Sequence, residues 1–323
     1  MGQLANGQWI ADDSPKISSE GRFQRPNSVF RNWVTEDGAP GPSGAGGYKA
    51  ESGRYHLYVS LACPWAHRTL IFRELKQLGD HVSVDIVHPD MLEEGWTFDA
   101  DGGPAKGDSL YGSKFLREIY TRSDACANGR VTVPVLFDRE TESIVSNESS
   151  EIIRMFNSAF NRITGNSLDF WPAESRIQIE KLNRRIYDCV NNGVYRAGFA
   201  ASQTAYDEAA RQLFGALDWL ELRLSDKRFL AGDQLTEADW RLFPTLVRFD
   251  KVYVTHFKCN RSRVTDLPNL WAYARNLFQM DGISRTVNFD HIVRHYYFSH
   301  ANINPNRIIP VGPVADWNEP HGR

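Results

Sequence analysis

The chain has 323 residues, 41% hydrophobic and 24% charged, which is enough to bury a core and, at about 150 residues per domain, to form two domains. Its 37 basic and 40 acidic residues give a net charge of −3, which removes the electrostatic attraction for nucleic acid or anionic lipid. The first residues lack the basic start and apolar run of a secretory signal, and no segment approaches the roughly 18 apolar residues of a membrane span. Composition therefore predicts a soluble, cytoplasmic protein without a nucleic-acid or membrane partner.

Residues 1 to about 50 show no sustained hydrophobic period and contain a Gly- and Pro-rich stretch at 38–47. A glycine-rich phosphate loop needs a strand before it and a helix after it, and neither pattern flanks this stretch. We therefore expect an ordered surface arm, held by isolated aromatic side chains, and no phosphate site.

From Arg54 onwards the pattern changes to short strands and amphipathic helices. Period-2 alternation predicts strands at 54–61, 81–89, 131–138 and 143–146. Helical spacing predicts helices at 63–79, which Gly79 can stop, at 109–124, and at 147–160, which Asn147 or Ser146 can cap. The order is strand, helix, strand, an insert with a helix, two strands, helix.

After Trp171-Pro172 the pattern is helical, with no convincing strand. Helices are expected at about 173–198, 204–226, 236–257, 269–280 and 283–299. Thr236 and Asp239 have the spacing of a capping box, and the Pro-rich tail from Asn302 is irregular. A strand-rich first half and a helical second half predict two segregated domains.

Cys63 is the most informative residue, because it lies where a predicted strand ends and a predicted helix begins, directly before Pro64. Backbone N–H groups and the positive end of the helix dipole favour a thiolate there. Lowering a thiol pKa from about 8.5 by about two units corresponds to roughly 2.7 kcal/mol and makes the anion dominant at neutral pH. His67 and Arg68, one turn on, can add positive charge. This context favours chemistry over simple packing.

The residue three positions after Cys63 is Ala66, whereas a dithiol oxidoreductase needs a second cysteine there to close its own disulfide. An adduct on Cys63 must therefore be resolved by an external thiol, which favours a glutathione-dependent enzyme. Cys126, Cys189 and Cys259 lack a helix-start context and are expected to be packing residues. Four dispersed cysteines do not form a disulfide scaffold.

Two further motifs can hold a peptide-like ligand. Pro134 follows Thr132 and Val133 at a strand start, and a cis bond before it would turn the Val133 backbone outward for β-type pairing. Glu148 and Ser149 begin the next predicted helix, whose N–H groups can receive a carboxylate while Glu148 pairs an ammonium. An ordinary edge proline and an ordinary helix cap would look the same in sequence, so both interpretations stay open.

A metal site is not expected. His291 and His295 are four residues apart on a predicted helix, and His256 lies close to Cys259. Neither pair has a third ligand at a recognisable spacing.

These elements, in this order, resemble the glutathione transferase superfamily. The closer resemblance is to the glutathionyl-hydroquinone reductases, also called its xi class. It spans nearly the whole chain and is carried by residues 27–36, 57–68 (LYVSLACPWAHR), 94–98, 130–135, 145–156, 188–199, 233–257 and 286–297.

The resemblance implies an α/β plus all-α fold, with a thioredoxin-like N-terminal domain built on a mixed four-stranded sheet. Residues 1–50 would form the arm and 51–165 the glutathione-binding domain, with its insert at about 90–130. Residues 172–323 would form the all-helical domain that carries the hydroquinone site and the tail. Pro134, Thr236 and Asp239 would be structural, and the chain would be a homodimer.

The resemblance also implies reduction of glutathionyl-hydroquinones with glutathione as the co-substrate and no tightly bound cofactor. Cys63 would attack the glutathione sulfur, the hydroquinone would leave as a carbanion equivalent that gains a proton, and a second glutathione would release oxidised glutathione. Tyr195 would donate the proton, while Tyr253 and Tyr296 would hydrogen-bond the sulfur and lower the thiol pKa. The implied glutathione contacts are Trp96, Arg130, Val131, Thr132, Val133, Glu148 and Ser149.

Two other functions stay open at this stage. An omega-like thiol transferase, acting on glutathione mixed disulfides or dehydroascorbate, would share Cys63 but would not need three phenols aimed at an aromatic ring. A binding module that kept the fold and lost the chemistry would show no thiol-dependent activity.

Overall fold

The computed structural model describes residues 2–11, 15–100 and 102–323, and the chain forms two compact units. The first unit comprises Met1–Ser14, Asn27–Leu168 and Thr286–Ser299. The second comprises Pro15–Pro26, Asp169–Arg285 and His300–Arg323. Each unit is therefore assembled from three separate stretches of chain.

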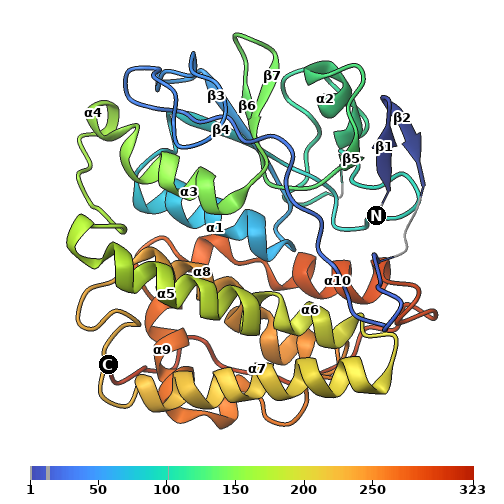
Figure 1. Cartoon of the computed structure of the whole chain (residues 1–323), viewed down its shortest axis with the longest axis vertical. Coiled ribbons are helices and arrows are strands. Elements are labelled where there is room, and N and C mark those ends of the chain that lie inside the picture. Colours follow the sequence, from blue (N-terminus) through green and yellow to red (C-terminus); the bar gives the residue numbers. More distant parts are fainter. Residues whose placement is uncertain (1, 12–14, 101) are drawn as a thin grey trace. The chain divides into compact units, whose positions relative to one another are not determined.

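A mixed four-stranded sheet organises the first unit, in the order β4-β3-β6-β7 (Figure 1). Its strands are β3 (Tyr55–Val59), β4 (Val82–Ile86), β6 (Val135–Asp138) and β7 (Ser143–Ser146). β3 pairs parallel with β4 and antiparallel with β6, and β6 pairs antiparallel with β7. The parallel pair needs a crossover, which helix α1 (Pro64–Leu75) supplies. The predicted thioredoxin-like sheet is confirmed.

Helix α1 ends earlier than the sequence pattern predicts. Gln77 has φ +55, and the Leu78 N–H donates to the Arg73 carbonyl at 2.8 Å, so the left-handed residue that ends the helix is Gln77. The expected stop at Gly79 is therefore wrong. Helix α3 (Ser149–Ser158) lies beside α1 (Figure 1), and the short α4 (Asn161–Thr164) follows.

The predicted helix at 109–124 is also too long, because α2 spans only Leu116–Ser123. The Asp108 carboxylate accepts the N–H groups of Leu110 and Ser113 at 3.1 and 3.0 Å. These local hydrogen bonds compete with helical ones and keep the chain in a loop up to α2.

A second, three-stranded sheet has the order β2-β1-β5 and joins the start of the chain to the insert. It consists of β1 (Gln3–Ala5), β2 (Gln8–Ile10) and β5 (Gly129–Arg130). Asn6 and Gly7 have φ +48 and +75, as a two-residue hairpin turn requires. The Asn-Gly dipeptide is the signal by which this hairpin could have been found in the sequence.

The part of the arm that follows runs along the edge of the four-stranded sheet. Arg31 bridges Ser146, and the Asn32 N–H donates to the Val145 carbonyl at 2.9 Å. The arm thereby covers the edge strand β7, which would otherwise expose unpaired backbone groups.

The last helix, α10 (Phe289–Ser299), belongs to the first unit and is preceded by a 3₁₀ turn at Ser284–Thr286. Four contacts within this unit anchor it. His67 Nε2 lies 2.8 Å from Thr286 Oγ1, and the Met91 N–H donates to Ser299 Oγ at 3.0 Å. Arg294 donates to both carboxylate oxygens of Asp90, and His295 Nδ1 lies 2.9 Å from the Pro89 carbonyl.

Helices form the core of the second unit, whereas its stretches Pro15–Pro26 and His300–Arg323 are irregular, with an isolated antiparallel bridge between Ile17 and Phe23. Its longer helices are α5 (Arg176–Ile186), α6 (Gly193–Gly198), α7 (Gln203–Arg223), α8 (Glu237–Arg248) and α9 (Pro268–Phe278). Short 3₁₀ turns lie at Ala173–Ser175 and Val264–Asp266. Among the residues that the structure describes, no helix is long and apolar enough to span a membrane.

Two π-helical turns, η2 (Tyr187–Asn191) and η3 (Phe249–Tyr253), interrupt helices that the sequence pattern predicts as continuous at 173–198 and 236–257. A π turn shifts the register by one residue, a change that a 3.6-residue period cannot reveal. Such turns are common at functional sites, and here one precedes Tyr195 and the other contains Tyr253.

The predicted capping box at the start of α8 is confirmed. The Asp239 carboxylate accepts from the N–H and the hydroxyl of Thr236 at 2.8 and 3.1 Å, and also from the Leu230 N–H and the Tyr273 hydroxyl. Both Thr236 and Asp239 are completely buried. Asp239 therefore ties the start of α8 to α9 through Tyr273.

Candidate active site

Cys63 occupies the N-cap position of α1, in an extended conformation, with Pro64 as the first helical residue. Ser60 forms the turn that leads into it: its carbonyl accepts the Cys63 N–H at 3.1 Å, and its hydroxyl accepts the Ala62 N–H at 3.2 Å. The Cys63 side chain is half-buried. The thiol thus lies at the positive end of the α1 dipole, where a thiolate is favoured.

The segment that precedes β6 runs past this thiol. Cys63 Sγ donates to the Val133 carbonyl at 3.6 Å, and the Val133-Pro134 peptide bond is cis. Tyr120 holds the neighbouring residue: its hydroxyl donates to the Thr132 carbonyl at 2.8 Å and accepts the Thr132 N–H at 3.1 Å. Burial raises the pKa of Tyr120, so the phenol stays protonated for this role.

Glu148 directly precedes α3 and is its N-cap, so the expected cap by Asn147 or Ser146 is wrong. The Glu148 carboxylate accepts from the N–H and hydroxyl of Ser150 at 3.0 and 2.7 Å, and from the Ser28 hydroxyl at 3.0 Å.

Burial alone would raise the pKa of Glu148. The hydrogen bonds from Ser150 and Ser28, together with the positive charge of Arg68, outweigh burial and hold this pKa below its ordinary value of 4.5. Arg68 itself is buried, and its guanidinium lies 4.6 Å from the centroid of the Trp65 ring. The start of α3 therefore keeps one anionic carboxylate beside the buried hydroxyl residue Ser149.

Asn147 is engaged elsewhere, which explains why it does not cap α3. Its side-chain oxygen accepts the Phe30 N–H at 3.2 Å, and its amide nitrogen donates to the Tyr120 hydroxyl at 3.2 Å. It links the arm to the phenol that positions Thr132.

Trp96 and Tyr296 both contact the ring of His295 on α10. The Trp96 ring is 5% exposed and stacks on His295 with centroids 4.9 Å apart and an interplanar angle of 22°. Tyr296 is 2% exposed and packs edge-on against the same His295 ring. The Leu116 N–H donates to the Trp96 carbonyl at 3.0 Å, which ties this residue to the start of α2.

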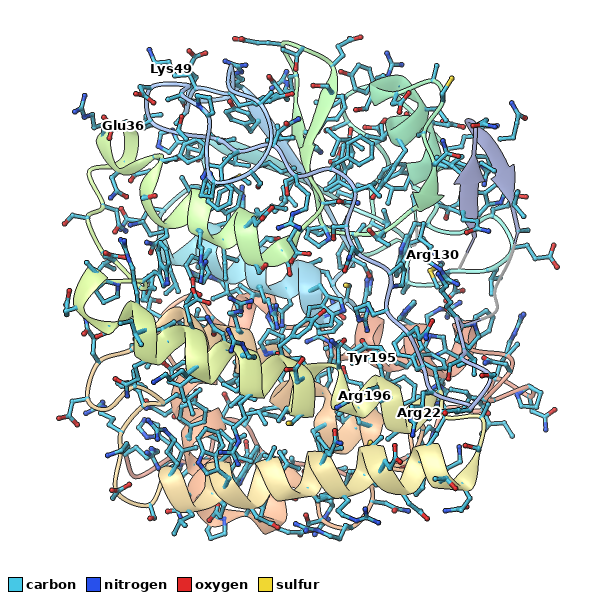
Figure 2. All side chains as sticks on the ribbon, in the orientation of Figure 1. Arg22, Glu36, Lys49, Arg130, Tyr195 and Arg196 are labelled. Atoms are coloured by element: carbon cyan, nitrogen blue, oxygen red, sulfur yellow. The ribbon has the colours of Figure 1, made fainter. Side chains whose placement is uncertain are left out.

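Arg130, labelled in Figure 2, is half-exposed in β5, and Gln3 of β1 lies opposite it in the antiparallel register. Val131 and Val133, which follow it, are 2% and 5% exposed. The first unit therefore contains every predicted glutathione contact together with Cys63 and Tyr296.

The other two predicted tyrosines lie together in the second unit. Tyr195 is on α6 (Figure 2), with its ring centroid 6.1 Å from that of Tyr253 and 5.4 Å from that of Phe257. Tyr253 is completely buried and stacks on Phe257, whereas Tyr195 is half-exposed. Gly198 permits this packing, because a Cβ there would lie 2.2 Å from the Phe257 ring.

The sequence pattern did not indicate Arg25, which lies against the same cluster. Its guanidinium carbon is 4.7 Å from the centroid of the Tyr195 ring, and its Nε donates to the Asn192 side chain at 2.6 Å. An isolated arginine in an aperiodic arm carries no signal of this contact.

The other cysteines and histidines occupy different environments. Cys259 is buried in an apolar environment that raises its thiol pKa, as expected of a packing residue. Cys126 is exposed, so its expected packing role is wrong: its N–H donates to Asp124 in a surface turn.

His256 Nε2 lies 3.1 Å from His300 Nδ1. Over residues 2–11, 15–100 and 102–323, no group of three or more potential metal ligands occurs.

Comparison with known proteins gives full-length similarity. The models "Glutathione S-transferase, N-terminal domain" and "Glutathione S-transferase, C-terminal domain" match residues 62–159 and 203–276. The chain is 57% identical to glutathionyl-hydroquinone reductase YqjG of Escherichia coli, over 100% of this chain and 98% of the relative. It is 47% identical to glutathionyl-hydroquinone reductase PcpF of Sphingobium chlorophenolicum, over 97% of each chain.

Solved structures agree. The glutathione-bound structure of YqjG from Escherichia coli matches with a TM-score of 0.93 and 55% identity, covering 100% of this chain and 99% of that one. A xi class glutathione transferase from Natrialba magadii matches with a TM-score of 0.91 and 45% identity, covering 100% and 96%.

The lowered pKa of Glu148 predicts a pH-dependent contribution to stability. Because the folded-state pKa lies below 4.5, the contribution is complete above that value and is lost as the pH falls through the folded-state pKa. Glu148→Gln removes a charged cap and should lower the free energy of unfolding by about 1–2 kcal/mol at pH 7. Denaturant unfolding at pH 7 and pH 3 should show this difference shrinking in acid.

Glu174→Gln, at an exposed carboxylate, is the matched control and should change stability little at either pH. A deficit of Glu148→Gln that is equally large at pH 3 and pH 7 would contradict the charged-cap explanation.

Proposed function

The chain belongs to the glutathionyl-hydroquinone reductases, the xi class of the glutathione transferase superfamily, and we propose that its reaction runs through a covalent adduct on Cys63. The enzyme reduces glutathionyl-hydroquinones with glutathione as the co-substrate. The position of the Cys63 thiol supports the mechanism most strongly: it lies at the start of α1, 3.6 Å from the Val133 carbonyl, with Ala66 where a resolving cysteine would be.

In the first half-reaction, the Cys63 thiolate attacks the sulfur of the glutathionyl substituent. A sulfur–sulfur bond forms while the bond between that sulfur and the ring carbon breaks. The electron pair of the broken bond stays on the ring carbon, which takes up a proton and leaves as the hydroquinone. Cys63 is oxidised to a mixed disulfide with glutathione, and the substrate carbon is reduced.

In the second half-reaction, the thiolate of a free glutathione attacks the glutathione sulfur of that mixed disulfide. Oxidised glutathione leaves and the Cys63 thiolate is regenerated. The sum is one glutathionyl-hydroquinone and one glutathione converted to one hydroquinone and one oxidised glutathione. The proton lost by the glutathione thiol balances the proton gained by the ring carbon. No tightly bound cofactor is needed.

The glutathione moiety is proposed to bind along three elements of the first unit. The backbone of Val131, Thr132 and Val133 offers β-type pairing to the peptide, next to the thiol. The start of α3, with Ser149, accepts a carboxylate, and the anionic Glu148 pairs the ammonium group of the γ-glutamyl end. The flanking contacts are Trp96 and Arg130.

Tyr195 is proposed as the proton donor to the ring carbon, with Tyr253 and Tyr296 hydrogen-bonding the reacting sulfur. The Tyr195–Tyr253–Phe257 cluster supports an aromatic-ring site, because offset and edge-to-face ring packing suits a flat hydroquinone. Of the two tyrosines in this cluster, Tyr195 is half-exposed and Tyr253 is buried, so Tyr195 is the one proposed to contact the ligand.

Cys63→Ala should abolish the reductase reaction, and Cys63→Ser should lower kcat/KM by at least about a thousandfold, because a hydroxyl is a far weaker nucleophile at neutral pH. Turnover is measured with a glutathionyl-hydroquinone and, in parallel, with a simple glutathione mixed disulfide. Mass spectrometry of the wild type after substrate addition without free glutathione should find one glutathionyl group on Cys63.

Cys189→Ala, at a half-buried thiol of the second unit, is the matched control and should keep normal turnover. Near-native activity of Cys63→Ser would contradict the thiolate mechanism. Higher turnover on the mixed disulfide than on the hydroquinone conjugate would favour an omega-like thiol transferase. Absence of both activities in the wild type, with no further change in Cys63→Ala, would favour a binding module.

Tyr195→Phe should lower kcat by about a hundredfold, the contribution typical of a positioned general acid, and leave the glutathione dissociation constant unchanged. Steady-state kinetics and glutathione titration separate the two quantities. Tyr206→Phe, which removes a phenol that donates to the Lys258 carbonyl, is the control and should change neither. Weaker glutathione binding with normal kcat would show that Tyr195 is not the acid.

We extend the proposal to a homodimeric, cytoplasmic enzyme with no nucleic-acid or membrane partner, as the family resemblance and the net charge of −3 support. Sedimentation equilibrium should give about twice the chain mass of 36.8 kDa. A mass of a single chain across the micromolar range would contradict the dimer.

A further inference from the structure

We propose that the hairpin formed by β1 and β2 is a positioning element for the glutathione site, and that Trp9 is its positioning residue. The inference rests on the proposed function, which assigns Trp96 and Arg130 as glutathione contacts. All the contacts that carry it lie within the first unit.

One side of the hairpin holds the strand that contains Arg130. β1 pairs antiparallel with β5, with Gln3 opposite Arg130 and Leu4 opposite Gly129. At the turn, the Gly7 N–H donates to the Ala127 carbonyl at 3.0 Å. The backbone of residues 127–130 is thus set by the hairpin just before it enters the segment 131–133.

The other side of the hairpin holds the turn that precedes Trp96. Trp9 Nε1 donates to the Glu93 carbonyl at 3.1 Å. Gly95 has φ +71, and a Cβ on it would lie 2.8 Å from the Trp9 ring, so the indole packs directly on the Gly95 backbone. The turn itself closes through the Gly95 N–H and the Leu92 carbonyl at 2.9 Å.

Arg117 of α2 completes this contact. Its guanidinium carbon lies 4.9 Å from the centroid of the Trp9 ring, and its Nη1 donates to the Glu94 carbonyl at 2.8 Å. The Trp9 indole therefore contacts both the 93–95 backbone and the arginine that holds it.

These contacts give the hairpin its role. Residues 93–96 and 129–130 lie outside the four-stranded sheet, so the sheet does not set their spacing. The hairpin bridges them, with Trp9 on one segment and β1 on the other. Without Trp9 the turn before Trp96 would have to be ordered when glutathione binds, and that ordering weakens affinity without touching the thiol chemistry.

Trp9→Ala in the full-length enzyme should raise the dissociation constant and the KM for glutathione about tenfold, with kcat at saturation within about twofold. Trp9→Phe keeps a ring against Gly95 and should recover most of the affinity. Trp33→Ala is the matched control, because Trp33 belongs to the same arm but packs on Gly41. It should leave both constants unchanged. Titration calorimetry and steady-state kinetics supply the measurements.

Gly95→Ala tests the same contact from the opposite side and serves if Trp9→Ala does not fold. Its Cβ would be strained by the positive φ and would clash with the indole, so this variant should also weaken glutathione binding. Wild-type affinity in a folded Trp9→Ala, even with a lowered Tm, would reduce Trp9 to a purely structural residue and overturn the inference.

Arg130→Ala and Trp96→Ala separate this inference from the proposed function. If neither weakens glutathione binding, the contacts are misassigned. If both weaken binding while the folded Trp9 and Gly95 variants bind normally, the contacts hold and the hairpin has no positioning role.

Discussion

The adjacency of the Cys63 thiol and the Val133 backbone is the constraint around which the rest of the site is arranged. The thiol is placed because β3 runs into the Ser60 turn and α1 begins at Pro64. The Val133 carbonyl is placed because its neighbour Thr132 is held on both backbone groups by a buried phenol. The antiparallel pairing of β3 with β6 joins these two local arrangements. The thiol that is proposed to attack and the backbone that is proposed to pair with glutathione are thereby held in contact, with Cys63 Sγ 3.6 Å from the Val133 carbonyl.

Segments added around the sheet supply the remaining groups of the first unit. The arm contributes Ser28, which donates to the carboxylate of Glu148, and α10 contributes His295, on which Trp96 stacks. The hairpin at the start of the chain contributes the strand that pairs with Arg130. The four-stranded sheet and α1 by themselves would present the Cys63 thiol and the Val133 backbone. The arm, the insert and α10 add polar and aromatic side chains around these two groups.

Prediction from sequence succeeded where one local pattern dominates and failed where a distant partner intervenes. The strand at 143–146 and the capping box of α8 follow directly from alternation and from Thr-x-x-Asp spacing. The cap of α3 does not, because Asn147, a better capping residue than Glu by intrinsic preference, is drawn to Phe30 and Tyr120. The predicted helix before Leu116 is too long because hydrophobic periodicity does not reveal that the Asp108 carboxylate accepts two backbone N–H groups of this segment.

The amino-acid order alone determined the place of Cys63 before Pro64, the lack of a cysteine three positions later and the Asn6-Gly7 turn, since each depends on residues a few positions apart. It also carried the motifs by which the family is recognised. Tertiary structure decided that Gln3 pairs with Arg130, that Trp96 stacks on His295 and that Arg25 lies over Tyr195. Hydrophobic periodicity indicates which face of a helix or strand is buried, but it does not indicate which distant segment covers that face. That choice is made by packing over the whole unit, where many weak contacts act together.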